Sequence, residues 1–204
     1  MKKLKKITLV FFLLLIIVLM LTIFFSPFGK HPGSNQRLIV TTVEINAPVD
    51  TVFNYLGNSE HAKQWSVFVH HITPLNSDSF PDGIEGGRRR CFCNADEKGT
   101  QWDELITEVI PGKKRQLVIY AMKDFFMSAD DLATDQMYEV SPNGKCRLSF
   151  TLFFKEAKPG LWDLLKTYIA AYRIRSIFER NLNNIKGIIE RTGSVESSVY
   201  QKNN

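Results

Sequence analysis

The chain has 204 residues, of which 44% are hydrophobic and 23% are charged, and this is enough for one domain with a sizeable core. Its net charge of +5 arises at the N-terminus, because four of its 26 basic residues are Lys2, Lys3, Lys5 and Lys6. The other 22 basic residues nearly balance the 21 acidic ones, so the overall charge does not indicate a nucleic-acid-binding surface.

An uncharged, strongly apolar stretch at residues 7–25 follows the basic stub at residues 1–6. As a helix it would be about 28 Å long at about 1.5 Å per residue, close to the thickness of the hydrocarbon core of a bilayer. The residues after it lack the small-residue pattern of a signal-peptide cleavage site, which favours an uncleaved, single-pass anchor. The lysines predict a cytoplasmic N-terminus at the cell membrane, with the rest of the chain on the extracytoplasmic side.

Residues 26–37 are rich in proline and glycine and are predicted to be a linker. A domain is predicted over residues 38–191, beginning with a strand at residues 38–45. Two short helices follow Pro48 and end near Trp65. Turn sequences rich in glycine, proline and asparagine separate six further strands, which indicates an antiparallel meander. These strands are predicted at residues 67–75, 87–94, 101–110, 115–122, 136–140 and 145–154.

Residues 160–191 form the longest helix that we predict in the domain, and residues 192–204 are predicted to be a flexible tail. The fold class is therefore α+β, with this helix lying across a curved antiparallel sheet of about seven strands.

Two apolar stripes on the long helix differ in direction by roughly a third of a turn. We therefore expect either a kink near residues 172–174 or two halves that pack against different partners. The second half should grip the sheet, and the first half is a candidate cavity gate or membrane-facing surface, with Trp162 and Tyr168 as interfacial aromatics. The stripes consist of Leu161, Leu164, Leu165, Tyr168 and Tyr172, and of Ile174, Phe178, Leu182, Ile185 and Ile189.

This order of elements resembles the START/polyketide cyclase-like (SRPBCC) superfamily, which has the helix-grip fold. The similarity covers residues 40–191 and rests on the order of several local patterns rather than on one motif. The resemblance implies a deep, mostly apolar cavity between the concave face of the sheet and the long helix. Members bind lipids, sterols, polyketides or related apolar molecules, and some are cyclases or aromatases. The patterns are VEINAPVDTVFNYL at residues 43–56, Trp65, Gly83, Gly86, Trp102-Asp103-Glu104, Pro111-Gly112 and FERNLNNIKGIIE at residues 178–190.

In such a fold some of the many aromatic side chains would line the ligand cavity. Residues 125–127, with the sequence Phe-Phe-Met, lie in a break between strands and are either a mouth or lid of the cavity or a buried plug. The candidate ligand-binding residues are Trp65, Trp102, Ile106, Tyr120, Phe125, Phe126, Tyr138, Phe150, Phe178 and Leu182.

Glu104 and Glu108 are the candidate catalytic residues, because they share one face of a predicted strand with Ile106. If that face points inward, burial would raise the pKa of either carboxyl group and suit it to acid–base catalysis. If the face points outward, Leu105 and Val109 point inward instead. The sequence leaves both arrangements open.

Arginines occupy three consecutive positions, Arg88, Arg89 and Arg90, and alternate between the two faces of a predicted strand. A solvated face is the expected arrangement. Contact with anionic lipid headgroups, or an inward arginine that binds a ligand carboxylate, are the alternatives. His70 and His71 are adjacent on a predicted strand, so their side chains should point to opposite faces, and no metal site or cofactor is expected.

The three cysteines, Cys91, Cys93 and Cys146, do not form a disulfide framework. One pair could bridge strands in an oxidising compartment, and the alternative is that all three are small, buried strand residues.

Two classes of function follow from the sequence and the resemblance. The first is a membrane-tethered binding or carrier domain for a lipid-like or other apolar small molecule. The second is an enzyme of the polyketide cyclase/aromatase or hydrolase type that uses a carboxylate in the cavity. A third hypothesis is an interaction domain whose cavity is filled by its own side chains. The sequence predicts no nucleic-acid partner and leaves the oligomeric state open.

Overall fold

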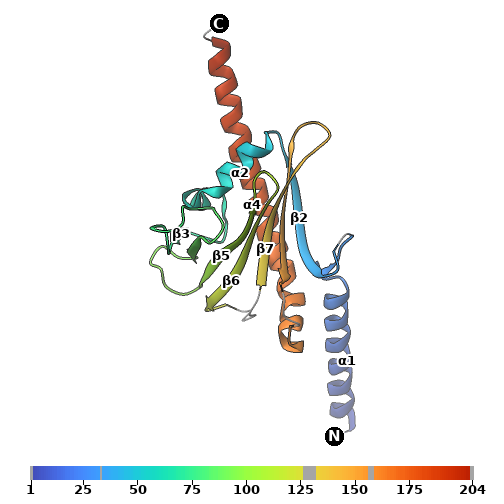
Figure 1. Cartoon of the computed structure of the whole chain (residues 1–204). Coiled ribbons are helices and arrows are strands. Elements are labelled where there is room, and N and C mark those ends of the chain that lie inside the picture. Colours follow the sequence, from blue (N-terminus) through green and yellow to red (C-terminus); the bar gives the residue numbers. More distant parts are fainter. Residues whose placement is uncertain (1, 33, 126–131, 156–158, 203–204) are drawn as a thin grey trace.

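The computed structural model describes residues 2–32, 34–125, 132–155 and 159–202. An antiparallel sheet lies beside one long helix, and a separate N-terminal helix extends from the domain (Figure 1). The helices are α1 (Lys2–Phe24), α2 (Val49–Gly57), the 3-10 helix η1 (Ser59–His61), α3 (Ala62–Trp65) and α4 (Leu161–Lys202). The strands are β1 (Gly29–Lys30), β2 (Arg37–Ile45), β3 (His71–Pro74), β4 (Arg88–Phe92), β5 (Gln101–Ile110), β6 (Lys114–Lys123), β7 (Leu132–Val140) and β8 (Cys146–Phe154).

Among the described residues, the eight strands form one sheet in the order β1-β2-β8-β7-β6-β5-β4-β3. The strands β3 to β8 are therefore a meander, and β2 pairs antiparallel with β8, as in the register Thr41↔Phe150. With α4 against the sheet, this arrangement is the helix-grip fold, so the predicted fold class is confirmed.

Two parts of the sheet differ from the sequence prediction. Residues 26–37, predicted to be a linker, contribute β1, which pairs with β2, and the buried ring of Phe28. The strand predicted at residues 67–75 is shortened to β3, because the Ser66 hydroxyl accepts hydrogen bonds from the backbone N–H groups of Phe68 and Val69. A serine that bonds its own following backbone in this way forms a local turn instead of a strand.

The long helix α4 continues through residues 172–174 and extends beyond Arg191 to Lys202, where a flexible tail was predicted. Its two stripes are accommodated by packing against different partners, the second of the two predicted alternatives. In the first half, Tyr168 and Ala171 pack on a cluster that includes Phe28, Leu152 and Phe154. In the second half, Leu182, Ile185 and Ile189 pack on a cluster that includes Ile45, Val52, Leu56, Tyr138 and Leu148. Phe178 contacts both clusters.

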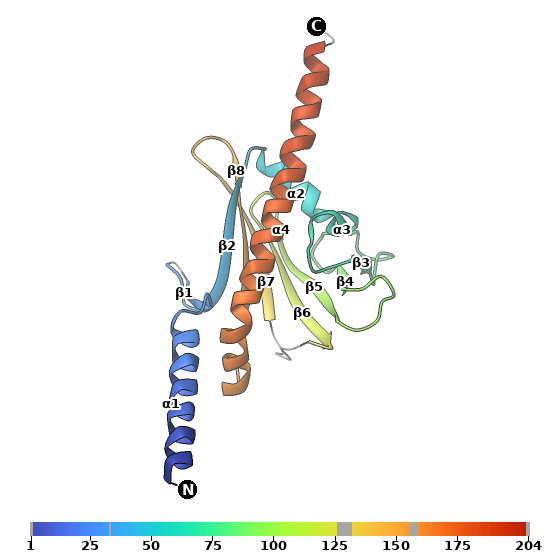
Figure 2. The ribbon, with the colours of Figure 1, turned by 180° about the vertical axis from the view of Figure 1, so that it is seen from behind.

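The side chains of residues 5–21 in α1 are exposed, and the part Lys5–Phe24 is long and apolar enough to cross a membrane. Its C-terminal end lies beside the first turns of α4 (Figure 2). The hydroxyl of Tyr172 donates a hydrogen bond to the carbonyl oxygen of Thr22 at 2.9 Å, and the hydroxyl of Ser26 donates to the carbonyl oxygen of Tyr168 at 2.8 Å. Ile23 packs on the same cluster as Phe28, so the end of α1 is docked onto the domain.

Candidate functional site

Two small cavities lie between the concave face of the sheet and α4. The apolar compartment has a volume of about 140 Å³ and is lined, among the described residues, by Phe68, Trp102, Ile119, Met122, Phe125, Leu132, Leu152, Ile174, Ile177 and Phe178. The central compartment has a volume of about 120 Å³ and also contacts polar groups, among them Arg89, Glu104, Thr134 and Gln136. Both compartments share the side chains of Phe68, Trp102, Ile177 and Phe178, which therefore separate one from the other.

Three aromatic rings from different segments meet at this partition. The ring of Phe68, in the turn before β3, stacks on Trp102 of β5 at a centroid distance of 5.7 Å. Phe125, just after β6, lies edge-on to both, at 6.0 Å from Phe68 and 5.3 Å from Trp102. Phe68 and Phe125 come from connecting segments rather than from strands, so they can move without disturbing the sheet.

A buried ion pair lies in the wall of the central compartment. The Nε of Arg89 donates to Glu104 Oε2 at 2.7 Å, and the indole Nε1 of Trp102 donates to Glu104 Oε1 at 2.9 Å. Burial is the largest single influence on Arg89 and lowers its pKa, but the charge of Glu104, the hydrogen bond to it and the neighbouring acidic groups together outweigh burial, and the net shift of the pKa is upward. Both oxygens of Glu104 are therefore engaged, and the pair is the charged part of a wall that also carries the neutral polar side chains of Thr134 and Gln136.

The second candidate carboxylate, Glu108, points to the other face of the sheet, so the prediction that it shares the face of Glu104 is wrong. The pairing of β5 with β6 shifts register between Ile106 and Glu108. A bulge of this kind inserts one extra residue and reverses the alternation of side chains after it. Glu108 consequently forms an ion pair with Lys114 at 2.8 Å, and Val109 points inward.

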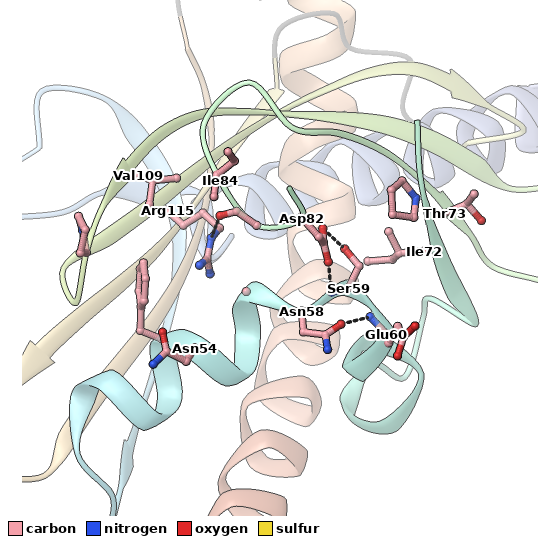
Figure 3. Close-up of a pocket in the computed structure, with 15 residues that line it drawn as sticks. Asn54, Asn58, Ser59, Glu60, Ile72, Thr73, Asp82, Ile84, Val109 and Arg115 are labelled. Carbon is pink, nitrogen blue, oxygen red and sulfur yellow. Dashed lines mark hydrogen bonds between the residues drawn. The ribbon is translucent and has the colours of Figure 1, made fainter. Parts of the chain in front are cut away.

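A larger hollow of about 850 Å³, the outer pocket, lies at the other end of the domain, between α2, η1, β3 and the turn from β5 to β6 (Figure 3). Arg115 projects into it from β6. Its Nε donates to the carbonyl oxygen of Gly83 at 3.1 Å, and its Nη1 donates to Gln136 Oε1 at 3.1 Å and Tyr138 Oη at 3.2 Å. Burial is the largest influence on Arg115 and lowers its pKa. These hydrogen-bond partners are neutral and belong to β7 and the Gly83 loop, and the guanidinium also lies over the ring of Phe53 in α2 at 4.5 Å, so Arg115 joins these three parts.

Gly83 permits the close approach of its loop to α2. Its φ of 78° lies in the left-handed region, and a Cβ at this position would overlap the carbonyl oxygen of Gly57. The neighbouring Asp82 accepts hydrogen bonds from the backbone N–H and the hydroxyl of Ser59, and Arg89 Nη1 donates to the same hydroxyl at 3.3 Å. A polar network therefore connects the outer pocket with the Arg89–Glu104 pair.

The candidate ligand-binding residues divide into two groups. Trp65, Trp102, Phe150 and Phe178 line the central compartment, and Trp102, Phe125 and Phe178 line the apolar compartment. The others lie elsewhere: Ile106 and Leu182 are buried in the core outside these two compartments, Tyr138 bonds Arg115, Tyr120 is exposed on the opposite face of the sheet, and Phe126 lies outside the described residues.

Sequence reasoning did not name several residues of the apolar compartment, namely Phe68, Ile119, Met122, Leu132, Leu152, Ile174 and Ile177. The alternation of β8 indicates that Phe150 and Leu152 share a face, and this signal was available in the sequence. For the three arginines the sequence favours a solvated face over an inward side chain. The structure nevertheless places Arg89 inward. Arg90 instead pairs with Asp103 at 2.6 Å on the opposite face.

The histidines and cysteines of this region also have defined positions. His70 precedes β3 and is not on the strand, so the two imidazoles lie together, with their Nδ1 atoms 2.9 Å apart, where opposite faces were predicted. Within the described ranges, no group of three His, Cys, Asp or Glu side chains could hold a metal ion.

All three cysteines are free. Burial raises the pKa of Cys91, and it raises the pKa of Cys93 and Cys146 to about 11, so all three thiols are protonated at neutral pH.

The sequence profile of a family described as "Polyketide cyclase / dehydrase and lipid transport" matches residues 36–190. The chain belongs to this family. The match includes strands β2 to β8, both compartments and α4 up to residue 190, and it confirms the resemblance to the START/polyketide cyclase-like superfamily. No curated protein matches the sequence of this chain.

Solved structures share the fold at low sequence identity. A START superfamily protein from Mycobacterium smegmatis is 13% identical, with a TM-score of 0.55 over 76% of this chain and 98% of that chain. A protein from Nitrosomonas europaea is 10% identical, with a TM-score of 0.56 over 77% of this chain and 96% of that chain. DynU16 of the dynemicin biosynthetic locus is 14% identical, with a TM-score of 0.53 over 75% of this chain and 47% of that chain. These similarities show the helix-grip fold, and the family is consistent with a domain that binds hydrophobic ligands.

Proposed function

We propose that this chain is a membrane-anchored domain that binds a lipid-like apolar molecule between its sheet and α4. The observation that carries the proposal is the apolar compartment, whose lining side chains are all hydrophobic. Its walls Leu132 and Leu152 belong to the same cluster as Phe28 and Ile23, the latter from the end of α1. The cavity wall and the end of the anchor therefore belong to one hydrophobic cluster. The family description, which includes lipid transport, supports the same class of ligand.

The ligand must displace side chains to enter. Both compartments are smaller than the roughly 300–1,000 Å³ of typical small-molecule pockets, so one acyl chain needs both of them. Phe68 and Phe125 are the rings that would move, because they lie on connecting segments. With the partition open, the chain of the ligand would occupy the apolar compartment and its polar end would reach the Arg89–Glu104 pair.

Photo-crosslinking of the full chain in lipid nanodiscs tests this proposal. The probe is palmitic acid with a diazirine near the middle of its chain, and the readout is the labelling of peptides from β6 and β8. We expect labelling of these strands in the wild-type chain and a several-fold loss in Leu152→Trp, whose indole fills the apolar compartment. Val140→Trp is the matched control, because Val140 is 71% exposed at the far end of β7. Labelling confined to α1, or equal in both variants, would overturn the proposal.

The arrangement of Glu104 favours binding over catalysis by this residue. A general base needs a lone pair within reach of the substrate proton, and here Glu104 is buried, is ion-paired with Arg89, and accepts a hydrogen bond on each oxygen, from Arg89 and Trp102. The carboxylate is thus better suited to hold Arg89 in place than to remove a proton. The enzyme hypothesis would require a ligand that first breaks this pair.

The membrane topology is part of the same proposal. Helix α1 spans the cell membrane with its basic end in the cytoplasm, as the positive-inside rule predicts, and the domain lies on the extracytoplasmic side. Fusion of a reporter to the C-terminus, active only on one side of the membrane, tests the orientation. A fusion that is active only in the cytoplasm would contradict it.

A further inference from the structure

The first turns of α4 expose an apolar surface that the domain leaves uncovered. Leu161 is 80% exposed and Trp162 is 73% exposed, and Ile169 and Tyr172 are also exposed. Scattered apolar residues are normal on a protein surface, but here they occupy one end of one helix, next to the apolar helix α1. The position of this surface relative to α1 decides what can cover it.

The depth of this surface follows from the contacts between the two helices. Helices α1 and α4 run side by side in the same direction, and the first turns of α4 lie beside the C-terminal part of α1 (Figures 1 and 2). The hydrogen bond from Ser26 to Tyr168 brings these two residues to the same level. At about 1.5 Å per residue, Leu161 lies about 10 Å below Tyr168. On α1, Leu19 lies about the same distance below Ser26, so Leu161 and Leu19 are at one level. Leu161 and Trp162 are therefore level with the apolar part of α1.

We infer that residues 161–168 at the start of α4 enter the lipid bilayer beside α1 as a second membrane contact. This inference rests on the proposed function, in which α1 spans the membrane. A surface level with a membrane-spanning segment meets lipid rather than water, and tryptophan prefers the boundary between headgroups and acyl chains. The occupant of this apolar surface is thus the bilayer itself.

Charged residues around the segment fit this placement. Arg37 lies over the ring of Tyr168 at 5.7 Å, and Lys30 pairs with Arg37 in the sheet, so both basic residues lie near the end of α1, at the level of lipid headgroups. Asp163 and Lys166 lie on the inserted turns and form an ion pair at 3.9 Å. This pair limits the segment to the interfacial region, since isolated charges are costly in the hydrocarbon core.

The second contact would bring the apolar compartment to the bilayer surface. Leu164, Ala170 and Ile174 of the same part of α4 pack on the cluster that walls the compartment. With two helices held in the membrane, the domain has a fixed orientation, and an acyl chain can pass from the bilayer to the cavity without crossing water. The bilayer is thus the source from which the proposed site takes its ligand.

Quenching of tryptophan fluorescence by brominated lipids tests the inference on the full chain. The protein is reconstituted in vesicles of phosphatidylcholine and phosphatidylglycerol, with the acyl chains brominated near the headgroup or near the chain end. The chain has three tryptophans, and Trp65 and Trp102 lie inside the domain. The exposed Trp162 should carry most of the quenching, which we expect to fall about two-fold or more in Trp162→Phe. The shallow bromines should quench more than the deep ones.

Two results separate this inference from the proposed anchor. Extraction with alkaline carbonate shows whether the full chain is integrated in the membrane, whatever the position of Trp162. If the chain is integrated but Trp162→Phe shows the same quenching by brominated lipid as the wild type, and acrylamide in water quenches Trp162, the second contact is refuted and the anchor stands. If carbonate releases the chain, both fail. Trp162→Phe is expected to fold normally, because Trp162 is exposed outside the core.

Discussion

The end of the domain beside α1 holds the apolar compartment, whereas the end beside α2 holds the outer pocket. The outer pocket has the larger volume, about 850 Å³ against about 140 Å³, but it contains Arg115, Asp82 and Glu60. The apolar compartment is small and has no polar group in its lining. The volume of a hollow does not show where an apolar ligand binds. The chemistry of the walls and the side chains that can move are better guides.

The difference also extends to what each end contributes to stability. At the α2 end, Arg115 holds β7 and the Gly83 loop through hydrogen bonds, and its guanidinium lies over the ring of Phe53 in α2. At the α1 end, aromatic rings contact one another with few polar constraints. We therefore expect the α2 end to be the rigid part and the α1 end to be the part that opens. Four predictions follow, from the largest expected effect to the smallest.

The first prediction concerns Arg89, which lies between the two ends. Arg89→Ala leaves the carboxylate of Glu104 buried without its cation, and we expect the free energy of unfolding to fall by about 3–5 kcal/mol. The measurement is urea unfolding of the full chain in detergent micelles. The double variant Arg89→Met, Glu104→Met should regain part of this loss, since it removes both charges, although the Trp102 N–H loses its acceptor and the Ser59 hydroxyl loses one donor.

Arg175→Ala is the control for this measurement. Arg175 pairs with Glu179 at 2.8 Å on an exposed face of α4, and an exposed pair contributes only about 0.3–0.5 kcal/mol. Equal losses in Arg89→Ala and Arg175→Ala would show that the buried pair is not a structural connection between the two ends.

The second prediction compares the two halves of α4. Leu182 is 1% exposed in the cluster at the α2 end, so Leu182→Ala should lower the free energy of unfolding by about 2–5 kcal/mol through loss of burial and a residual cavity. Leu161→Ala should change it by less than about 0.5 kcal/mol, because Leu161 is exposed. Both values come from the same urea titration. A large effect of Leu161→Ala would mean that the start of α4 supports the core after all.

The sequence predicted the order of the elements well, because strand and helix signals are local. Residues 101–110 are bounded by turn residues on both sides, and the predicted strand coincides with β5. The meander and the helix across it then follow from short turns and from one long apolar helix. The β1 strand was not predicted, since Gly29 and Lys30 have no strand preference and pair only because Phe28 is held between Phe154 and Tyr168.

The site was harder to predict than the fold, because the direction of a side chain depends on register. One bulge between Ile106 and Glu108 places the two candidate carboxylates on opposite faces of the sheet. No single residue type in the sequence predicts such a bulge. Tyr138 and Phe150 are both aromatic residues of predicted strands, so both are candidates for the cavity lining. Tyr138 forms hydrogen bonds with polar groups instead, because Arg115 lies next to it. Phe68 lies in a turn fixed by Ser66, so periodicity gives no information about it.

The third prediction tests whether the outer pocket matters for the ligand. Tyr138→Phe removes a hydroxyl that donates to Gln136 at 2.8 Å and accepts from Arg115, and we expect a loss of about 1–2 kcal/mol in unfolding free energy. Labelling of β6 and β8 by the diazirine probe should be unchanged. Tyr120→Phe, on the opposite face of the sheet, is the control and should change stability by at most about 0.5 kcal/mol. Loss of labelling in Tyr138→Phe would place the ligand at the α2 end.

The fourth prediction concerns the acid side of the stability profile at the α2 end. Glu190 accepts hydrogen bonds from Lys186 Nζ at 2.7 Å and from the backbone N–H of Asn46 at 2.8 Å, and it so connects α4 to the segment after β2. The hydrogen bond from Lys186 is the largest cause that lowers the pKa of Glu190 in the folded chain. The unfolded chain therefore binds the proton at a higher pH, near the ordinary glutamate value of about 4.3.

The sign of the effect follows from this order of pKa values. The contribution of Glu190 is fully present above the ordinary value and is lost as the pH falls through the lowered pKa of the folded chain. Glu190→Gln should lower stability slightly at neutral pH and make the decline below about pH 4.5 less steep, by a few tenths of a kcal/mol for an exposed pair. Urea midpoints between pH 7 and pH 3 measure it. Glu179→Gln is the control, because Glu179 pairs with Arg175 within α4 and, among the described residues, forms no hydrogen bond to another element. An equal change in the pH dependence of stability in Glu179→Gln would show that Glu190 does not fix α4 to β2.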